Sequence, residues 1–224
     1  MSPYPVVTID GPAGAGKSTV ARELARRLGY AYVNSGAIYR AVAWRASTGG
    51  GVAGPTLVEL LATIRVELRA GAEGQRVVVD GQDVTEALRA PPMSDLTSSL
   101  SQRPEVRAFA DALQRRLAAE GPVVVEGRDA GTVVFPEADC KFYLDASLEA
   151  RARRRLADRR GSGEGGELVA IRAAILTGDR ADQTRAVAPL ARATEATYVD
   201  SSEMTVDEVV ELMAKDVERV CSTR

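Results

Sequence analysis

The sequence predicts an α/β protein with a five-stranded, doubly wound parallel sheet, and three observations support this class. Five short apolar runs have the composition of strands that are buried on both faces of a sheet. Helical patterns separate consecutive runs, as in a parallel sheet with flanking helices. A glycine-rich stretch joins the first run to the first helix. The five expected strands are Pro5–Asp10, Ala31–Asn34, Val123–Glu126, Lys141–Leu144 and Ala196–Val199.

The length and composition of the chain suit a single globular domain over residues 1–224. Hydrophobic residues make up 45% of the chain and charged residues 27%, which is ordinary for a protein with a sizeable buried core. The net charge of −2 gives no general basic field, so we expect no nucleic acid partner. No segment reads as a signal peptide or a membrane span, and we expect a cytoplasmic protein with no membrane partner.

Cysteine and histidine usage excludes several kinds of catalytic site. Cys140 and Cys221 lie far apart, without metal-ligand spacing or a disulfide framework, which fits a reducing compartment. The chain contains no histidine, so Ser-His-Asp and Cys-His catalysis and histidine-bound metals are excluded. No feature of the sequence points to an oligomer, and a monomer is the default expectation.

The first expected strand is followed by Gly11–Thr19, which reads GPAGAGKST and matches the pattern G-x-x-x-x-G-K-[ST]. A helix expected at Val20–Gly29 begins directly after it, so the motif has the strand–loop–helix context of a phosphate-binding loop. Glycines let backbone N–H groups curl around phosphate oxygens, and the helix dipole favours their negative charge. The expected ATP-binding residues are Gly11, Pro12, Ala13, Gly14, Ala15, Gly16, Lys17, Ser18 and Thr19.

Two side chains of this loop have separate expected tasks. Lys17 reaches the β- and γ-phosphates of ATP, and the hydroxyl of Ser18 ligates the Mg²⁺ that accompanies the nucleotide. The chain holds only three lysines against many arginines, and arginine does not replace the compact charge of a lysine in this position. The alternative is a glycine-rich turn that fits the pattern by chance, for which we estimate roughly a few matches per thousand.

Between the second and third strands the pattern changes and predicts an insertion. We expect a strand-to-helix loop at Ser35–Arg40, with the helix continuing through Trp44, and a flexible turn at Ser47–Pro55 that opens the insertion. A short helix at Leu57–Leu61 precedes Ile64–Arg69, which alternates apolar and charged residues. Arg76–Asp80 alternates more loosely, and glycines lie between the two runs, which predicts a β-hairpin. The sequence therefore predicts a small antiparallel subdomain here.

The second half of the chain contains further helical patterns and one arginine-dense segment. The expected helices are Ser94–Leu100, Pro104–Ala119, Ser147–Arg160, Glu167–Thr177 and Val206–Val220, with Pro91 and Pro92 breaking the chain before the first of them. Six arginines lie on the third of these helices, and the glycine-rich run Gly161–Gly166 follows it directly. A charge run is usually a solvated face. Here its place after a parallel strand and beside a glycine hinge favours a mobile lid that brings arginines onto phosphates.

Charged residues also follow the third parallel strand, at the sheet edge where such folds bind ligands. Glu126 is a candidate for holding a metal-bound water, and Arg128 with Asp129 for gripping a phosphate and a ribose hydroxyl. The alternative for the Arg128–Asp129 pair is a surface ion pair without function. The N-K-x-D signature with which GTPases read their base is absent, which weakens that interpretation.

Taken together, these residues resemble the bacterial cytidylate kinase family of nucleoside monophosphate kinases, over residue 5 to about residue 202. The matching segments are Asp10–Thr19, Ser35–Arg40, Gly127–Asp129, Gly131–Pro136, Leu144–Ser147 and Arg185–Leu190. The resemblance implies a P-loop NTPase fold in one kinase domain. It also implies a CMP-binding insert at residues 36–104, with a small antiparallel sheet, and a mobile lid at residues 152–167.

The resemblance also implies roles for individual residues. Ser35, Arg40, Arg128 and Asp129 would hold the phosphate and ribose of CMP, and Ser98, Arg107, Asp182 and Arg185 would read the cytosine or its phosphate. Arg151 and Arg155 resemble lid arginines that close on the transferring group. The implied catalytic residues are Lys17, Arg128, Arg151, Arg155 and Arg185.

Three positions depart from the family pattern. Ser18 stands where some members have glycine, which strengthens its assignment to Mg²⁺, and Ala130 replaces a common methionine. Gly178 occupies a position where members often carry an arginine that contacts phosphate. Arg180, two residues later, is the candidate substitute.

The reaction implied by the resemblance is transfer of the γ-phosphoryl group of ATP to CMP or dCMP, giving CDP or dCDP and ADP. We expect CMP to be preferred over UMP and AMP, with Asp182 or Ser98 accepting from the cytosine amino group and Arg107 donating to N3. One alternative is another small-molecule P-loop kinase, for shikimate or a different monophosphate. The other is an ATP-dependent switch or binding protein without phosphoryl transfer.

Overall fold

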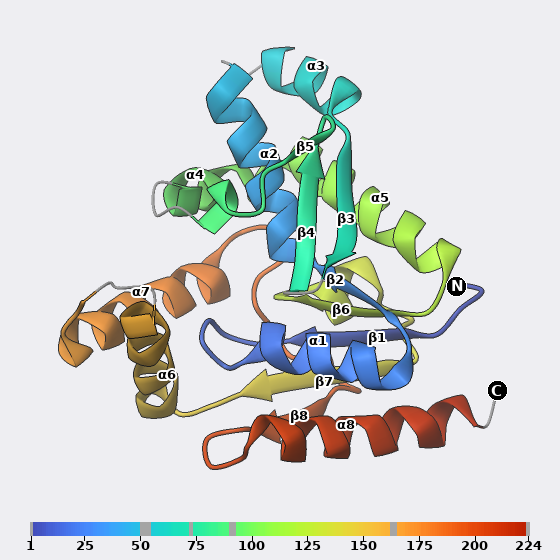
Figure 1. Cartoon of the computed structure of the whole chain (residues 1–224), viewed down its shortest axis with the longest axis vertical. Coiled ribbons are helices and arrows are strands. Elements are labelled where there is room, and N and C mark those ends of the chain that lie inside the picture. The colour runs from blue at the N-terminus through green and yellow to red at the C-terminus, as the bar shows by residue number, and fades with distance from the viewer. Residues whose placement is uncertain (1, 50–54, 72–73, 90–92, 162–164, 223–224) are drawn as a thin grey trace.

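A computed structural model describes residues 2–49, 55–71, 74–89, 93–161 and 165–222, and its centre is a parallel sheet (Figure 1). The strands are β1 (Val6–Asp10), β2 (Ala31–Asn34), β6 (Val123–Gly127), β7 (Cys140–Asp145) and β8 (Thr197–Asp200). They are hydrogen-bonded in the order β2-β6-β1-β7-β8. The five expected parallel strands are therefore confirmed, each within a few residues of its predicted bounds.

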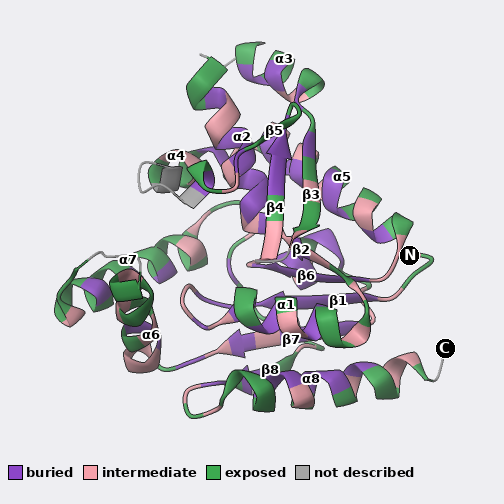
Figure 2. Ribbon diagram, in the orientation of Figure 1, coloured by how far each residue is buried: buried purple, intermediate pink, exposed green. Residues whose placement is uncertain are grey.

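Strand β1 lies in the middle of the sheet and is buried along its whole length (Figure 2). Its register pairs Val6 with Val123 of β6 and Val7 with Cys140 of β7. From β1 the chain first builds the sheet on one side, through β2 and β6, and then crosses to the other side through β7 and β8. Such a switch point opens a crevice at the carboxyl ends of the strands, where doubly wound sheets bind their ligands.

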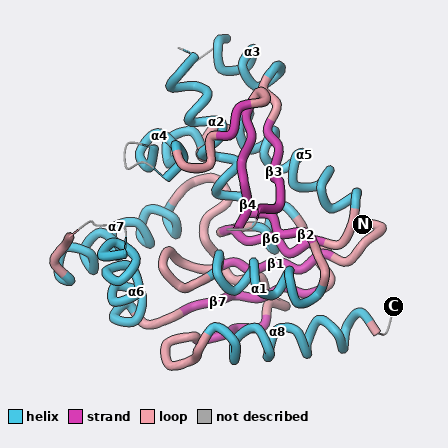
Figure 3. The backbone as a smooth tube through the Cα atoms, viewed as in Figure 1, coloured by secondary structure: helices cyan, strands magenta, loops and turns pink. Residues whose placement is uncertain are grey.

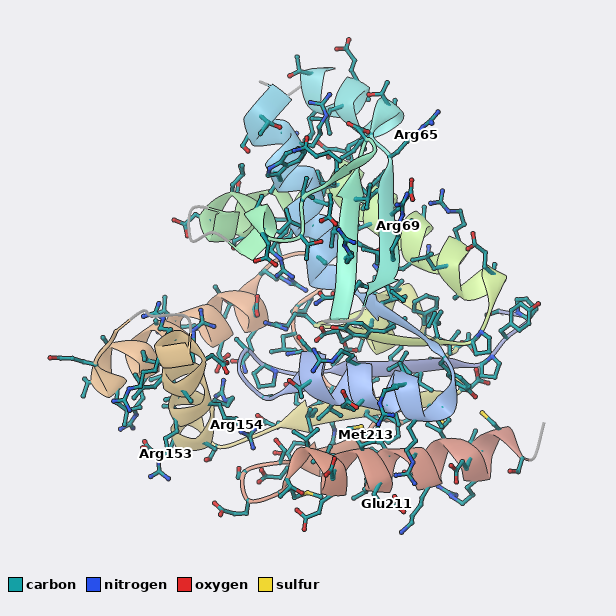
Figure 4. The ribbon with its side chains drawn as sticks, in the orientation of Figure 1. Arg65, Arg69, Arg153, Arg154, Glu211 and Met213 are labelled. Carbon is teal, nitrogen blue, oxygen red and sulfur yellow. The ribbon has the colours of Figure 1, made fainter. Side chains whose placement is uncertain are left out.

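Helices cover both faces of the sheet and bury its apolar side chains. On one face α1 (Lys17–Leu28) and α8 (Val206–Cys221) pack together over β1 and β7. Met213 of α8 is fully buried there, which contributes about 1.5–3 kcal/mol to folding. Figure 4 shows Met213 on the inner side of α8 and Glu211, which pairs with Arg27 of α1, on the outer side. The described part of the chain contains no helix with the length and apolarity needed to cross a membrane.

The other face is covered by α5 (Pro104–Glu120) and the short π-helix η2 (Ala130–Val134). The expected helix from Pro104 is confirmed, whereas the π-helix was not anticipated. Asp10 holds it in place, because its carboxylate accepts hydrogen bonds from the backbone N–H groups of Ala130 and Gly131. No local sequence pattern signals a side chain located 120 residues away.

The inserted segment forms a second buried cluster above the sheet, with members from Ala37 to Leu113. The hairpin and short helices expected here are present. The elements are α2 (Ser35–Gly49), α3 (Pro55–Thr63), β3 (Val66–Gly71), β4 (Gly74–Val79), β5 (Gln82–Asp83), η1 (Ala87–Arg89) and α4 (Met93–Leu100). The strands form an antiparallel sheet in the order β3-β4-β5.

The expected helix through Trp44 is confirmed, but the loop expected at Ser35–Arg40 is wrong, because α2 already begins at Ser35. The side chain of Asn34 accepts a hydrogen bond of 3.0 Å from the N–H of Ala37, so the last residue of β2 also satisfies the first turn of the helix. The predicted turn at Ser47–Pro55 is helical up to Gly49, and its residues 50–54 lie outside the described ranges, as do Pro91 and Pro92.

Two helices, α6 (Leu148–Gly161) and α7 (Leu168–Thr184), lie beside the carboxyl ends of the strands (Figure 3). The expected end of α7 at Thr177 is wrong. The helix passes Gly178 and ends at Thr184, seven residues further. Asp179 is buried and paired with Arg151 of α6, which stabilises the added turns. Residues 162–164 of the glycine-rich run Gly161–Gly166 lie outside the described residues.

Candidate active site

The loop between β1 and α1 has the geometry of an anion cradle. Gly11 has a φ of +148°, and a Cβ there would lie 2.0 Å from the carbonyl oxygen of Leu144, so no other residue fits. Gly16 adopts the left-handed conformation at the N-cap of α1, and no side chain caps the helix. The N–H groups of the first turn therefore point into the loop without a competing side-chain acceptor.

The Lys17 side chain is buried beneath this loop. Its ammonium group donates a hydrogen bond of 2.7 Å to the carbonyl oxygen of Pro12. Burial, and then the nearby Arg128 guanidinium, lowers the pKa of Lys17 to about 7, although Glu126 and Asp10 favour the charged form. A polyanion bound in the loop would supply the missing negative charge and raise this pKa again.

The Asp10 carboxylate links the phosphate loop to the charged loop that follows β6. Its two oxygens accept hydrogen bonds of 2.9 Å and 2.7 Å from the N–H groups of Ala130 and Gly131. Burial raises the pKa of Asp10 to about 6, against the effect of these two donors. Asp10 thus fixes the backbone that carries Arg128 and Asp129, a role that the sequence analysis missed although Asp10 directly precedes the glycine-rich motif.

Asp129 is the centre of a buried charge cluster formed by three elements. Its carboxylate pairs with Arg107 of α5 and, at 3.3 Å, with Arg185, which follows α7. The Arg107 guanidinium lies 5.8 Å from the centre of the Tyr39 ring. The two arginines therefore hold one carboxylate between them in a largely desolvated place, and the nearby Asp111 also favours the charged form of Arg107.

A second ion pair joins the sheet to α7. Arg128, after β6, donates a hydrogen bond of 2.7 Å to the carboxylate of Asp182, and the two side chains are 28% and 29% exposed. They are neither buried nor on an open surface, so both can turn toward a ligand.

These groups lie in one cleft of about 880 Å³, a volume suited to two nucleotides or one large ligand. Phosphate-loop residues Ala13–Thr19 line one part of it. All the expected acceptor residues line the cleft as well, namely Ser35, Arg40, Ser98, Arg107, Arg128, Asp129, Asp182 and Arg185. Among these residues Arg40 is partly buried, and burial lowers the pKa of its guanidinium. The side chain of Ser98 is exposed. Gly11 and Pro12 lie at the start of the loop, outside the lining.

Comparison with known proteins decides the family. The model of the family described as cytidylate kinase matches residues 7–219. The chain belongs to the cytidylate kinase family. A cytidylate kinase of Pelotomaculum thermopropionicum is 45% identical over 220 residues, 97% of each chain, and one of Symbiobacterium thermophilum is 44% identical over 217 residues, 96% of each chain.

The fold of this family member agrees with a distant solved structure. The crystal structure of an uncharacterized protein from Eubacterium ventriosum has a TM-score of 0.54 to this chain at 11% sequence identity. The match covers 96% of this chain and 98% of the other. This likeness concerns the fold alone. The strand order and the phosphate loop are those of a P-loop NTPase fold.

In this member of the cytidylate kinase family, the α6 arginines that contact the phosphate loop are not the expected pair. Arg151 is buried, donating to Asp179 at 2.6 Å and to the carbonyl oxygen of Ala13 at 3.2 Å. Arg154 reaches the carbonyl oxygens of Ala15, at 3.3 Å, and Ser201. Figure 4 shows Arg154 on the side of α6 that faces the phosphate loop and Arg153 pointing away.

The lid prediction paired Arg151 with Arg155, four residues apart. The structure instead places Arg151 and Arg154, three residues apart, against the phosphate loop, while Arg155 is exposed and lines the cleft. Helical spacing allows either pair, and the choice between them is made by distant partners, among them the carbonyl groups of Ala13 and Ala15. At Gly178 a Cβ would meet no atom within 4 Å, and Arg180 is exposed and does not line the cleft.

Ser18 and Glu126 supply oxygen groups beside Lys17 that would suit a magnesium ion. Tyr32 donates a hydrogen bond of 2.6 Å to Glu126, and the hydroxyl of Ser18 also contacts Tyr32. Hard oxygen ligands suit Mg²⁺, which takes one or two groups from the protein and the rest from phosphates and water. Among the described residues no group of three or more acidic, histidine or cysteine side chains forms a site of its own.

Proposed function

We propose that this chain transfers the γ-phosphoryl group of ATP to CMP or dCMP, giving CDP or dCDP and ADP. The observation that carries the proposal is the single cleft in which a phosphate-binding loop faces a cluster of arginines held by Asp129 and Asp182. Membership of the cytidylate kinase family supports the same reaction.

On the donor side, Gly11–Thr19 would bind the phosphates of ATP, and Lys17 would stabilise the charge that develops on the transferred group. The attacking oxygen of a nucleoside monophosphate is already anionic near neutral pH, so the reaction needs no general base. Its demand is to align two polyanions and neutralise their charge. Histidine, which the chain lacks, has no part in this chemistry.

Mg²⁺ would enter with ATP, held by the hydroxyl of Ser18 with Glu126 next to it. The ion supplies positive charge to the phosphate oxygens. The orientation of the protein groups comes from Tyr32, whose hydroxyl contacts both side chains.

On the acceptor side, Ser35, Arg40 and Arg128 would hold the phosphate of CMP. Asp182 and Ser98, which line the same cleft, would meet its sugar. The buried Arg107–Asp129 pair presents a donor next to an acceptor. Cytosine offers the complement, an acceptor at N3 and a donor at its amino group. We therefore assign the acceptor for the amino group to Asp129 rather than to Asp182, which pairs with Arg128, or to Ser98.

The flanking segments complete the proposal. Residues 36–104 form the CMP-binding insert and residues 152–167 the lid of a single kinase domain, in which Arg155, Arg128 and Arg185 would approach the transferring phosphoryl group. Arg151 would act indirectly, because it donates to the carbonyl oxygen of Ala13 and so supports the backbone of the phosphate loop. We further propose that the enzyme works as a monomer in the cytoplasm, which light scattering and cell fractionation test.

The experiment that tests this function is a coupled assay of ADP release with ATP, Mg²⁺ and a panel of acceptors. We expect rapid release with CMP and dCMP and only a slow background with water, UMP, AMP or shikimate. Release that is fastest with shikimate or AMP would assign the chain to another kinase specificity. Release that no acceptor accelerates would leave an ATPase or switch protein.

A further inference from the structure

The outer edge of β2 is occupied by one side chain of the insert. Strand β2 lies at the end of the main sheet and pairs with β6. On its other edge, Gln75 of β4 donates from Nε2 to the carbonyl oxygen of Tyr32 at 2.5 Å and accepts at Oε1 from the N–H of Asn34 at 3.2 Å. The carbonyl of one residue and the N–H of the second residue after it face the same edge of a strand. The Gln75 amide thus pairs with β2 as a neighbouring strand would.

Gln75 lies where the insert meets the sheet. Gly71 and Gly74 are the last paired residues of the hairpin, and Gln75 follows Gly74, so its contact pins this end of the hairpin to β2 (Figure 1). A Cβ at Gly74 would lie 3.7 Å from the guanidinium of Arg22, which places this end beside α1 as well. Leu68 of β3 packs against both the insert cluster and the cluster under the sheet.

The residues that Gln75 contacts continue directly into the acceptor side of the cleft. Tyr32 donates to Glu126, and the amide of Asn34 donates to the Tyr32 hydroxyl at 3.3 Å. The next residue, Ser35, donates from its hydroxyl to the carbonyl oxygen of Glu126 at 2.7 Å. Displacing the hairpin from β2 therefore disturbs the segment that orients Ser35 and the start of α2, which carries Arg40.

We propose that Gln75 is a positioning residue for the acceptor: its amide locks the insert hairpin to the edge of β2 and so sets the acceptor side of the cleft relative to the phosphate loop. The inference rests on the proposed function. It predicts an asymmetry, because in the described part of the chain Gln75 bonds directly to β2 and reaches the phosphate loop only indirectly, through the Tyr32 hydroxyl that contacts Ser18. Loss of the amide should weaken use of CMP far more than use of ATP.

The test compares Gln75→Ala with Gln82→Ala, a control at an exposed glutamine of the same antiparallel sheet. We expect Gln75→Ala to raise the KM for CMP by about 5- to 20-fold, in keeping with two hydrogen bonds between uncharged groups, and to change the KM for ATP by less than about twofold. Hydrogen exchange at the Asn34 amide should accelerate, because its acceptor is removed. Gln82→Ala should behave as the wild type in all three measurements.

Each other result counts against the inference. An unchanged KM for CMP, equal rises in both KM values, or an Asn34 amide that stays protected would overturn it. A wild type that does not phosphorylate CMP at all would instead overturn the proposed function. The same KM comparison, made with the acceptor that the wild type does use, would then decide the role of Gln75.

Discussion

The two sides of the cleft are built in different ways. The donor side is one continuous loop, Gly11–Thr19, whose backbone N–H groups and buried lysine face the ligand. The acceptor side is assembled from side chains of α2, α4, α5, α7 and the loop after β6, between Ser35 and Arg185. A backbone cradle recognises any polyphosphate, whereas a set of side chains recognises one base and one sugar. The first side should therefore determine rate and the second specificity.

The largest expected effect breaks the donor side. Lys17→Ala should lower kcat by a factor of about 10²–10⁴, as loss of a preorganised charge does in other enzymes, while the preference among acceptors stays the same. Steady-state kinetics with CMP and UMP measure both quantities. Lys215→Ala on the exposed face of α8 is the control. A folded Lys17→Ala protein with a near-normal kcat would remove Lys17 from the catalytic site.

A second prediction concerns the buried ion pair between α6 and α7 that lies next to the phosphate loop. It tests whether this pair stabilises the donor side. Asp179→Ala leaves the Arg151 guanidinium buried without its carboxylate, and should lower the free energy of unfolding by about 3–5 kcal/mol. Urea denaturation measures the loss. Glu149→Ala, which breaks ion pairs on the exposed side of α6, should cost about 0–1 kcal/mol. Equal effects of the two variants would contradict a structural role for Arg151.

The third prediction breaks the acceptor side. The Arg107–Asp129 pair leaves buried groups unpaired when uracil replaces cytosine, so wild type should prefer CMP over UMP by roughly 10- to 10³-fold in kcat/KM. Arg107→Met should lose most activity with CMP and narrow this ratio, while the KM for ATP changes little. Arg116→Met on the exposed side of α5 serves as the control. A ratio that Arg107→Met leaves unchanged would show that the base is read elsewhere.

The smallest expected effect is a pH dependence of ATP affinity, which arises from Lys17 on the donor side. The ligand-free protein holds the pKa of Lys17 at about 7, below its ordinary value of 10.5, and bound phosphates favour the charged ammonium. ATP binding at pH 8 should therefore take up a proton, and ATP affinity should fall by up to about tenfold per pH unit above 7. Calorimetry in buffers of different ionisation enthalpy counts the proton, and Lys17→Met should abolish the uptake. Proton release, or uptake that persists in Lys17→Met, would contradict this assignment.

The difference between the donor side and the acceptor side also explains which site residues could be predicted from the sequence alone. The phosphate loop depends on local glycines and a local helix, so its residues and its place between β1 and α1 could be predicted directly. Arg128 and Asp129 could be predicted from their place after a parallel strand. The other acceptor residues could be named only by family resemblance, because their spacing in the chain says nothing of their meeting in space. The start of α2 at Ser35 depended on the Asn34 side chain, and the inward face of α6 on the carbonyl groups of Ala13 and Ala15.

Long-range polar contacts were beyond prediction for the same reason. The hydrogen bonds of Asp10 to the loop after β6 and of Gln75 to β2 join segments 120 and about 40 residues apart. Neither residue stands out by composition or periodicity. Such contacts decide how the two sides of the cleft are held relative to each other, which is where a sequence pattern is least informative.

The central claim is that the phosphate loop and the arginine cluster bind two nucleotides in one cleft. Calorimetric titration with a bisubstrate analogue, adenosine and cytidine joined through five phosphates, tests it most directly. The account predicts that the analogue binds at least about 10²-fold more tightly than ATP or CMP alone, because the second half binds intramolecularly. The analogue with uridine in place of cytidine should bind more weakly. An adenosine–cytidine analogue that binds no more tightly than ATP would contradict the account.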